Sequence, residues 1–220
     1  MLVENLHEFS LSPRDAVAVQ RSLANRVSTH NLIHAPRLIL GLDVSVGYNS
    51  DAVAAAVVLK FPGFQIIEKA VVEDKVSFPY IPGLLSFREI PISLKACEKL
   101  TAKADMAIID GQGMAHPRRI GLASHLGLFL NIPAIGCAKS RLCGEYEEPP
   151  QEAGKYSYLL DNGETIGAVL RTRVKCKPLF VSIGHQVDLT AAIDWVLKCC
   201  QDYRLPEPTR LAHLASRGKL

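Results

Sequence analysis

The 220-residue sequence predicts a mixed α/β fold, with one central sheet and helices on both of its faces. Two observations support this prediction. Three extended segments joined by short turns come first, which is typical of an antiparallel meander. Helices and short apolar strands then alternate along the rest of the chain, which adds βα units to the same sheet. No segment resembles a linker, so we expect a single domain over residues 1–220.

Capping and turn residues mark the elements of the first half of the chain. Ser12 and Pro13 are typical of a helix start, with a serine N-cap and a proline in the first turn, and we expect this helix to end near residue 27. Strands are then expected over residues 37–46, 52–61 and 64–77. The breaks between them, at residues 47–50 and 62–63, contain the glycine, asparagine and proline that turns prefer.

In the second half of the chain, helices and strands alternate. Ser86 is expected to cap a helix that ends near residue 100. Further strands are expected over residues 106–110, 133–138, 156–160, 165–173 and 179–183, and further helices over residues 119–130, 189–201 and 207–217. The Asp-Asn-Gly sequence at residues 161–163 is a turn, so the two strands beside it are expected to form a hairpin.

Composition argues against several classes of protein. Apolar residues make up 48% of the chain, which is enough for a sizeable core. The longest aliphatic run, residues 52–59, is too short to cross a bilayer, and the first 13 residues contain no apolar signal-peptide core. The six cysteines include no Cys-x-x-Cys pair, so we expect free thiols and no structural zinc. These features favour a cytoplasmic protein without a membrane partner, and the net charge of +3 does not by itself indicate nucleic acid.

Three acidic residues lie at positions where a carboxylate is energetically unfavourable, beside apolar segments that are expected to be buried. Asp43 follows the apolar run 38–42, Asp110 follows the run 106–109, and Glu89 lies in the helix between the two strands. Carboxylates at strand ends lie at the rim of a sheet, and close carboxylates repel one another unless a cation or a shared proton intervenes. Oxygen ligands suit Mg²⁺ or Mn²⁺. Taken singly, each acid has an ordinary explanation in a turn or on a surface, but together they indicate metal-assisted chemistry on a phosphate.

The order of these acids, on a meander followed by βα units, resembles the ribonuclease H-like fold, which places the end of its first strand beside the end of its fourth. Longer strings extend the resemblance. They read SFPYIPGLLSFRE at residues 77–89, DGQG at 110–113, HPRR at 116–119, GCAKSRL at 136–142 and LPEPTR at 205–210. On these strings the chain resembles the endonuclease V family, the deoxyinosine-directed repair nucleases, over about residues 17–215. His116, which begins the third string, is expected near phosphate.

The resemblance implies roles around a catalytic metal. Asp43 and Asp110 resemble the direct metal ligands, and Glu89 resembles the acid that holds water on the metal. Lys139 resembles the lysine near the scissile phosphate, although a lysine just after a strand is also typical of an exposed surface. His213 stands at a position that varies in this family, and it either assists the metal or is a histidine on a helix face. The implied cofactor is Mg²⁺, with Mn²⁺ as a substitute, and no organic cofactor is expected.

The loop at residues 79–85 contains most of the implied lesion-recognition residues. Its first part resembles the wedge inserted at the lesion, namely Pro79, Tyr80, Ile81 and Pro82. Two prolines stiffen such a loop. Without the resemblance, it would be a proline-rich connection with its tyrosine packed on the core. The pocket that receives the flipped base is implied at Gly83, Leu85 and Gly111. Glycines suit such a pocket because a ligand can approach their backbone closely.

The implied function is that of a metal-dependent DNA repair endonuclease. It would recognise deoxyinosine and hydrolyse a phosphodiester on the 3′ side of the lesion, leaving 3′-OH and 5′-phosphate ends. The implied partners are deoxyinosine-containing DNA and, as a further option, inosine-containing RNA. We expect the protein to be a monomer.

Three other functions remain open on the sequence alone. The same pocket could serve mainly single-stranded inosine-containing RNA, which a contact to a 2′-OH would decide. A non-catalytic inosine-binding module would keep the wedge and the pocket but would not need all three acids. A sugar-kinase or chaperone-type ATPase has similar phosphate-binding strings, but such enzymes need two domains of this kind and 220 residues hold one.

Overall fold

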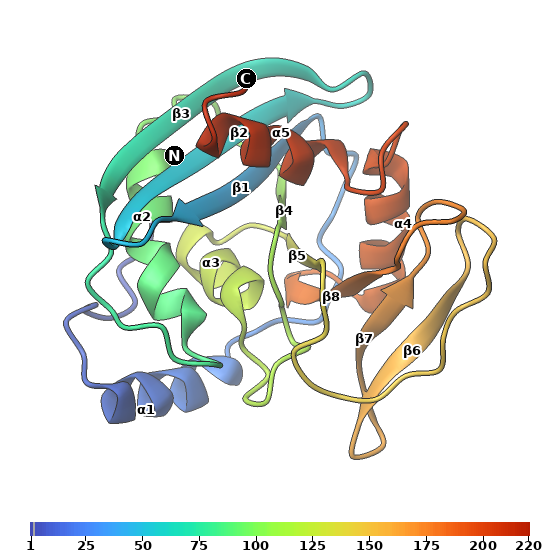
Figure 1. The fold of residues 1–220 in the computed structure, drawn as a ribbon, viewed down its shortest axis with the longest axis horizontal. Coiled ribbons are helices and arrows are strands. Elements are labelled where there is room, and N and C mark those ends of the chain that lie inside the picture. The colour runs from blue at the N-terminus through green and yellow to red at the C-terminus, as the bar shows by residue number, and fades with distance from the viewer. Residues whose placement is uncertain (2) are drawn as a thin grey trace.

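The structure is a computed structural model and describes residue 1 and residues 3–220. Within this part of the chain, eight strands form one sheet (Figure 1). The strands are β1 (Leu38–Val46), β2 (Asp51–Lys60), β3 (Gln65–Lys75), β4 (Met106–Ile109), β5 (Ala134–Ala138), β6 (Tyr156–Asp161), β7 (Glu164–Leu170) and β8 (Leu179–His185). The helices are α1 (Pro13–Ala24), α2 (Leu85–Glu98), α3 (Leu122–Leu130), α4 (Leu189–Cys199) and α5 (Glu207–Ser216).

The sheet is mixed, as predicted, and its strand order is β3-β2-β1-β4-β5-β8-β7-β6. β1, β2 and β3 form the expected antiparallel meander. β4 runs parallel to β1, and β5 runs parallel to β4. The β6–β7 hairpin joins the sheet through β8, which is antiparallel to β5. Because β1, β4 and β5 are parallel neighbours, their carboxyl ends meet at one edge of the sheet.

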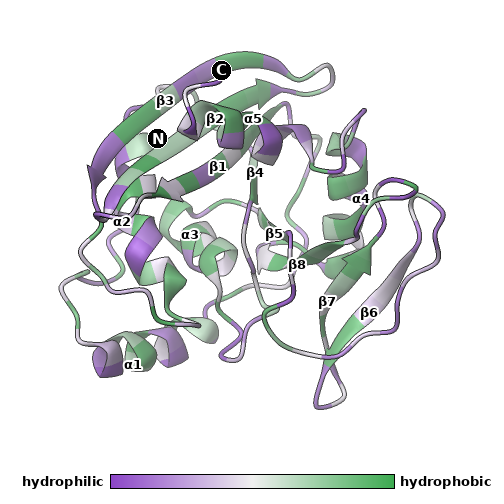
Figure 2. Ribbon diagram, viewed as in Figure 1, coloured by the Kyte–Doolittle hydropathy of each residue, from purple (hydrophilic) through white to green (hydrophobic). Residues whose placement is uncertain are grey.

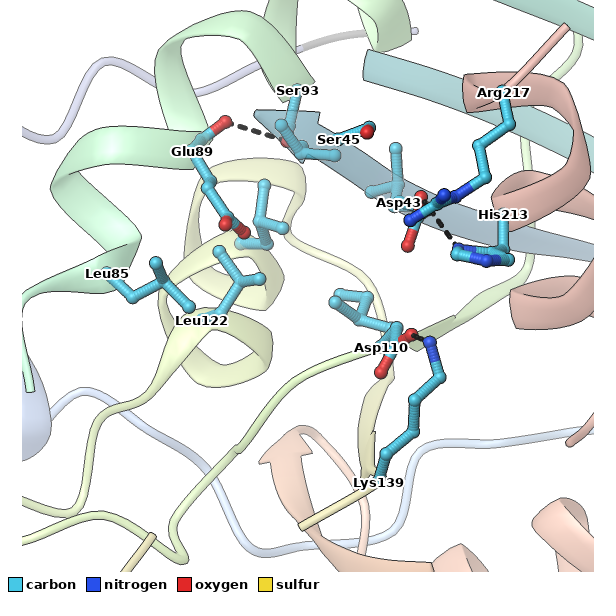
Figure 3. A pocket seen from close by; sticks show the side chains of 14 residues that line it. Asp43, Ser45, Leu85, Glu89, Ser93, Asp110, Leu122, Lys139, His213 and Arg217 are labelled. Atoms are coloured by element: carbon cyan, nitrogen blue, oxygen red, sulfur yellow. Dashed lines mark hydrogen bonds and ion pairs between the residues drawn. The ribbon is translucent and has the colours of Figure 1, made fainter. Parts of the chain in front are cut away.

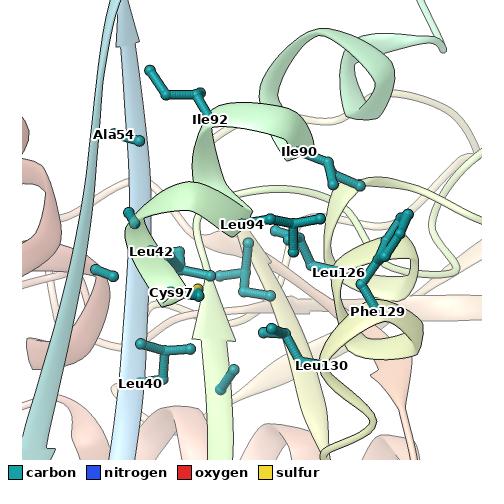
Figure 4. Packing of buried hydrophobic residues seen from close by; sticks show 14 of the residues in the cluster. Leu40, Leu42, Ala54, Ile90, Ile92, Leu94, Cys97, Leu126, Phe129 and Leu130 are labelled. Atoms are coloured by element: carbon teal, nitrogen blue, oxygen red, sulfur yellow. The ribbon is translucent and has the colours of Figure 1, made fainter. Parts of the chain in front are cut away.

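Helices cover both faces of this sheet, as predicted (Figure 1). On one face, Leu40 and Leu42 of β1 share a buried cluster with Ile90 of α2 and with Leu126 and Phe129 of α3 (Figure 4). On the other face, α4 packs on β7 and β8, while α5 packs on β1 and β2. Figure 2 shows hydrophobic residues concentrated in the central strands. Both faces of these strands are therefore buried, which explains why they read as continuous apolar runs.

The approach of α5 to β1 depends on Gly41. A Cβ atom at this position would lie 2.0 Å from the carbonyl oxygen of Pro208, in the first turn of α5. No side chain fits in that space, so only glycine allows the contact. The contact fixes where α5 crosses the sheet, and it therefore fixes where the later residues of α5 lie.

Ser12 and Ser86 were predicted to cap the N-terminal ends of α1 and α2. Ser12 caps α1 as predicted, because its Oγ accepts a hydrogen bond from the backbone N–H three residues later at 3.2 Å, although the helix ends at Ala24 rather than near residue 27. The prediction that Ser86 caps α2 is wrong. The helix begins at Leu85, and the Ser86 hydroxyl is buried against Nδ1 of His125 at 3.1 Å. A buried hydroxyl needs a hydrogen-bond partner, and for Ser86 this partner is His125 of α3 rather than a backbone N–H of its own helix.

The prediction that α3 begins at residue 119 is also wrong. Arg119 has a φ of +57°, in the left-handed region, and α3 begins three residues later at Leu122. The Arg119 guanidinium forms ion pairs with Asp161 and Glu164 of the β6–β7 hairpin. This segment therefore turns to meet the hairpin before the helix can start.

The cysteines and helices bear on two further predictions. All six cysteines are free, which confirms the prediction of unpaired thiols. In the part of the chain that the structure describes, none of the helices combines the length and the apolar character that crossing a membrane requires.

Candidate active site

Strand register brings Asp43 and Asp110 together. Leu42 of β1 pairs with Ile109 of β4, and these are the last paired residues of the two parallel strands. The next residue on each strand is an aspartate, so the two carboxylates lie side by side at the same edge of the sheet. Their side chains are only 10% and 13% exposed. Two partly desolvated acids are therefore held next to each other.

A cavity of about 270 Å³ borders these carboxylates, and we call it the acidic cavity (Figure 3). Its lining includes all five side chains predicted to be catalytic, namely Asp43, Glu89, Asp110, Lys139 and His213. They are supplied by β1, by α2, by the residues that follow β4 and β5, and by α5. The structure thus brings the predicted residues to one place, while their individual roles stay predictions.

Glu89 reaches the acidic cavity from α2 (Figure 3). Burial raises the pKa of its carboxyl to about 8, and the nearby charges of Asp43 and Asp110 add to the effect. Like charges in a poorly solvated site favour the neutral form of an acid, so Glu89 is largely protonated at neutral pH. A cation bound in the cavity would favour the ionised form of this acid.

Lys139 forms an ion pair with Asp110 (Figure 3). Burial raises the pKa of the Asp110 carboxyl, although the charge of Lys139 acts in the opposite direction. The Lys139 side chain is 40% exposed, so its ammonium group also faces solvent. A lysine in this position can contact both the acid and a ligand that enters the cavity.

Two residues of α5 contact Asp43 from the other side. Nδ1 of His213 lies 3.4 Å from Oδ2 of Asp43, and the Ser216 hydroxyl donates a hydrogen bond to the same oxygen at 2.6 Å. Ser216 is only 4% exposed. Because both contacts go to one carboxylate oxygen, they fix the orientation of the Asp43 side chain.

Two residues on this side of the cavity, Ser216 and Arg217, were not predicted from the sequence. Ser216 contacts Asp43, and Arg217 lines the cavity. They follow His213 by three and four residues, a spacing that places side chains on one face of a helix. That spacing was the available signal, but it gains meaning only once α5 is known to cross β1 beside Asp43.

A second cavity, of about 370 Å³, lies beside the first, and we call it the loop cavity. Residues of both the predicted wedge and the predicted base pocket line it, namely Tyr80, Ile81, Pro82, Gly83, Leu85 and Gly111. The predicted wedge residue Pro79 is exposed and does not line it. The two cavities share four wall residues, which are Leu85, Asp110, Leu122 and Lys139. A ligand in the loop cavity therefore lies next to the acidic cavity.

The wedge loop is anchored on one side of an exposed tyrosine. Phe78 is 6% exposed and packs near Phe87 of α2, with ring centroids 5.7 Å apart. Tyr80, two residues later, is 71% exposed. The alternative in which Tyr80 packs on the core is therefore wrong, and its ring is available to a ligand.

Three side chains hold the backbone of Gly83. Its carbonyl oxygen accepts hydrogen bonds from Gln20 Nε2 at 3.0 Å, His116 Nε2 at 2.9 Å and Arg118 Nη2 at 2.7 Å. The φ of Gly83 is +79°, which favours glycine. Gln20 and Arg118 were not predicted to do this. For Gln20 the reason is that the sequence of α1 gave no sign that this helix approaches the loop. His116 was expected near phosphate, but it is 2% exposed and binds this carbonyl instead.

The carboxylates fit a metal that needs few protein ligands. Among the described residues, no three His, Cys, Asp or Glu side chains form a group that could hold an ion. Mg²⁺ sites commonly use one or two carboxylates and complete the coordination with water and substrate phosphate. The neighbouring carboxylates of Asp43 and Asp110 match that pattern.

Comparison with known proteins identifies the family. A family model described as Endonuclease V matches residues 21–214. The curated protein "Endonuclease V" of Dehalococcoides mccartyi is 49% identical over 215 residues, which cover 97% of this chain and 96% of that protein.

Solved structures agree with this assignment. Endonuclease V from Bacillus subtilis has a TM-score of 0.94 and 32% identity, covering 99% of this chain and 96% of that chain. Endonuclease V from Ciona intestinalis, in complex with a 23-mer DNA containing an inosine followed by a ribo-adenosine, has a TM-score of 0.81 and 27% identity, covering 95% and 98%. The predicted ribonuclease H-like fold is confirmed by these neighbours. The chain therefore belongs to the endonuclease V family of nucleases.

Proposed function

We propose that this protein is a metal-dependent DNA repair endonuclease. It would recognise deoxyinosine and hydrolyse a phosphodiester on the 3′ side of the lesion, leaving 3′-OH and 5′-phosphate ends. The observation that carries the proposal is the common wall between the loop cavity and the acidic cavity. A base held in the loop cavity would bring its own backbone to the carboxylates. The inosine in the Ciona complex supports inosine as the base.

Asp43 and Asp110 are proposed to hold the metal, which we take to be Mg²⁺ with Mn²⁺ as a substitute, because both ions prefer carboxylate oxygens. When bound, the ion supplies positive charge to the phosphate and makes water more acidic. Glu89 faces the same cavity from α2 and is proposed to orient the attacking water. His213 and Ser216 keep the Asp43 carboxylate in one orientation.

Lys139 is proposed to act on the phosphate itself. Its ammonium group lies at the wall that both cavities share, next to Asp110. Hydrolysis increases negative charge at the phosphate oxygens, and a fixed cation lowers the energy of that state more than the energy of the bound substrate. Lys139 would therefore contribute mainly to turnover.

The loop cavity is proposed to select the base. The exposed Tyr80 and the stiff proline loop can occupy the space that a flipped nucleotide leaves in the duplex. Hypoxanthine has a carbonyl and an N–H where adenine has an amine and a bare nitrogen, so backbone groups at Gly83 and Gly111 can reject adenine. The hydrogen bonds to the Gly83 carbonyl would keep that backbone in place.

A second candidate function is an inosine-specific ribonuclease that acts mainly on single-stranded RNA. The ribo-adenosine that follows inosine in the Ciona complex favours this candidate, because a 2′-OH lies beside the lesion there. We further propose that the enzyme is a monomeric single domain and acts in the cytoplasm, where its six free thiols would stay reduced.

Comparative nicking tests the proposal. Matched DNA strands with one deoxyinosine or one deoxyadenosine, their duplexes, and the corresponding inosine RNA are incubated with Mg²⁺, Mn²⁺, Ca²⁺ or a chelator. We expect cleavage of the deoxyinosine strand with Mg²⁺ and Mn²⁺, none with the chelator, and none by Asp110→Asn. Cleavage of RNA alone would favour the second candidate. Cleavage that ignores the base, or that continues in the chelator, would contradict both.

A further inference from the structure

Arg217 occupies a position on the acidic cavity that the mechanism above does not use. It caps the C-terminal end of α5, one turn after His213, and its side chain lines the cavity that contains the three carboxylates. Figure 3 shows Arg217 pointing toward Asp43, while Lys139 enters from the opposite side beside Asp110. Two cations therefore face the same acidic site from opposite rims.

The guanidinium of Arg217 has no partner among the residues that the structure describes, unlike two other arginines of this protein. Within the described part of the chain, it forms neither a side-chain hydrogen bond nor an ion pair. By contrast, Arg210 on the same helix binds Glu207, and Arg171 binds Glu148. An exposed arginine beside three carboxylates, yet paired with none of them, is free to bind an anion that enters the cavity.

We infer that Arg217 binds a phosphate of the substrate strand, at or next to the scissile phosphodiester, from the rim opposite Lys139. The inference rests on the proposed nuclease function. A guanidinium is planar, stays charged, and can donate two parallel hydrogen bonds to phosphate oxygens. Because Asp43 and Asp110 repel a phosphate, a strand that crosses this cavity needs cations on both sides.

A different role for Arg217 would be to offset the charge of the carboxylates within the protein. The two roles differ in their dependence on the substrate. If Arg217 only offset the charge of the carboxylates, its loss would change the affinity for the strand by the same factor whichever phosphate had been replaced. A direct contact makes the effect of Arg217 depend on one phosphate only, which a double-mutant cycle between protein and DNA detects.

The experiment measures binding of a single-stranded oligonucleotide with one deoxyinosine. Asp110→Asn serves as the parent protein, so that the strand is not cleaved during the titration. Arg217→Gln in this background keeps a long polar side chain but removes the charge. We expect binding to weaken roughly 10-fold, as for the loss of a charged hydrogen bond. The slope of log K against log salt should fall by about 0.7, the value for one phosphate on a single strand.

The decisive step replaces one phosphate at a time, near the inosine, with a neutral methylphosphonate. At one position the replacement should weaken the parent by the same factor as Arg217→Gln and should weaken Arg217→Gln no further. Lys219→Ala is the matched control, because it removes an exposed cation from the same end of the chain that does not line the cavity. It should behave like the parent at every phosphate.

Two results would overturn the inference. One is that every methylphosphonate weakens the parent and Arg217→Gln by equal factors, and the other is that Lys219→Ala reproduces the Arg217→Gln pattern. Failure of the proposed function is seen separately, because it would appear as equal binding of inosine and adenine strands by the parent protein.

Discussion

The acidic cavity and the loop cavity share a wall but are built in opposite ways. The acidic cavity collects charged side chains from distant elements, and burial together with the nearby charges of Asp43 and Asp110 raises the pKa of Glu89 to about 8. The loop cavity is shaped by backbone around glycines, and burial there lowers the pKa of His116 to about 4. One region therefore holds acids that resist ionisation, and the other holds a neutral histidine that donates to a carbonyl.

This difference indicates a division of work. Close carboxylates are unfavourable in the protein alone and become favourable when a cation binds, so the acidic cavity suits chemistry on a phosphate. Three hydrogen bonds to the Gly83 carbonyl contribute no charge, but they hold the backbone of this loop in a defined position, which suits discrimination between similar bases. The predictions that follow test whether the two functions can be separated.

The largest effect is expected from the strand-end acids. Asp43→Asn or Asp110→Asn should lower the rate of cleavage on the order of 10²-fold or more, because each removes a negative charge that holds the cation, and the cation stabilises the transition state. Single-turnover nicking in Mg²⁺ measures this effect. Near-normal nicking by either variant would remove that residue from the proposed metal site.

His213 should matter less than Asp43. His213→Ala is expected to lower turnover by roughly 10-fold, within the range for residues that orient a metal ligand. His213→Asp should retain more activity than His213→Ala, since a carboxylate can also position water or metal. Equal rates for the wild type and both variants would make His213 an ordinary helix-face residue.

Tyr80 tests the loop side of the comparison. Tyr80→Ala should weaken cleavage of duplex DNA by about 10-fold and affect single strands less, because displacing a paired base costs a few kcal/mol and a single strand largely avoids that step. Parallel nicking of a duplex and its isolated lesion strand provides the measurement. Equal losses on both would mean that Tyr80 makes a general contact with the backbone.

The last effects concern stability rather than cleavage, and they have opposite signs in the two regions. Glu89 ionises near 4.5 when unfolded and near 8 when folded, so its contribution to stability is lost as pH rises through this window in the presence of a chelator. The pKa of His116 falls from 6.5 to about 4 on folding, so its contribution is lost as pH falls through that window.

Each effect is expected to be on the order of a few kcal/mol. Thermal unfolding measured across pH should show that Glu89→Gln loses less stability than the wild type as pH rises from 4.5 to about 8. His116→Gln should lose less on the acid side. The same pH dependence in wild type and variants would show that neither group is perturbed by its cavity.

Apolar runs locate strand ends, so Asp43 and Asp110 of the acidic cavity could be predicted from the residues themselves, whereas Lys139 and His213 were implied by the resemblance to the family. Asp43 and Asp110 meet through the register of two such strands. Ser216 and Arg217 were missed, since their importance depends on the close contact of α5 with Gly41. The hydrogen bond from Gln20 to the Gly83 carbonyl was missed for a similar reason, because this bond joins two segments that are far apart in the chain.

Ser86 shows the same limit at the level of secondary structure. A serine at a helix start favours a cap, and local sequence gives no reason to expect otherwise. Its hydroxyl forms a hydrogen bond with the buried His125 instead, and α2 begins at Leu85 without a side-chain cap. Long-range contacts therefore decided the details that local patterns could not.

Binding by Asp43→Asn tests the division between the two cavities most directly, because Asp43 lines the acidic cavity and not the loop cavity. The variant is titrated with matched single strands that contain deoxyinosine or deoxyadenosine, and the ratio of the two dissociation constants is compared with that of the wild type in Ca²⁺. Because Gly83 and its partners are unchanged, we expect the ratio to be preserved while cleavage in Mg²⁺ is lost. A ratio that falls to one would show that the acidic cavity also selects the base, and it would contradict the account.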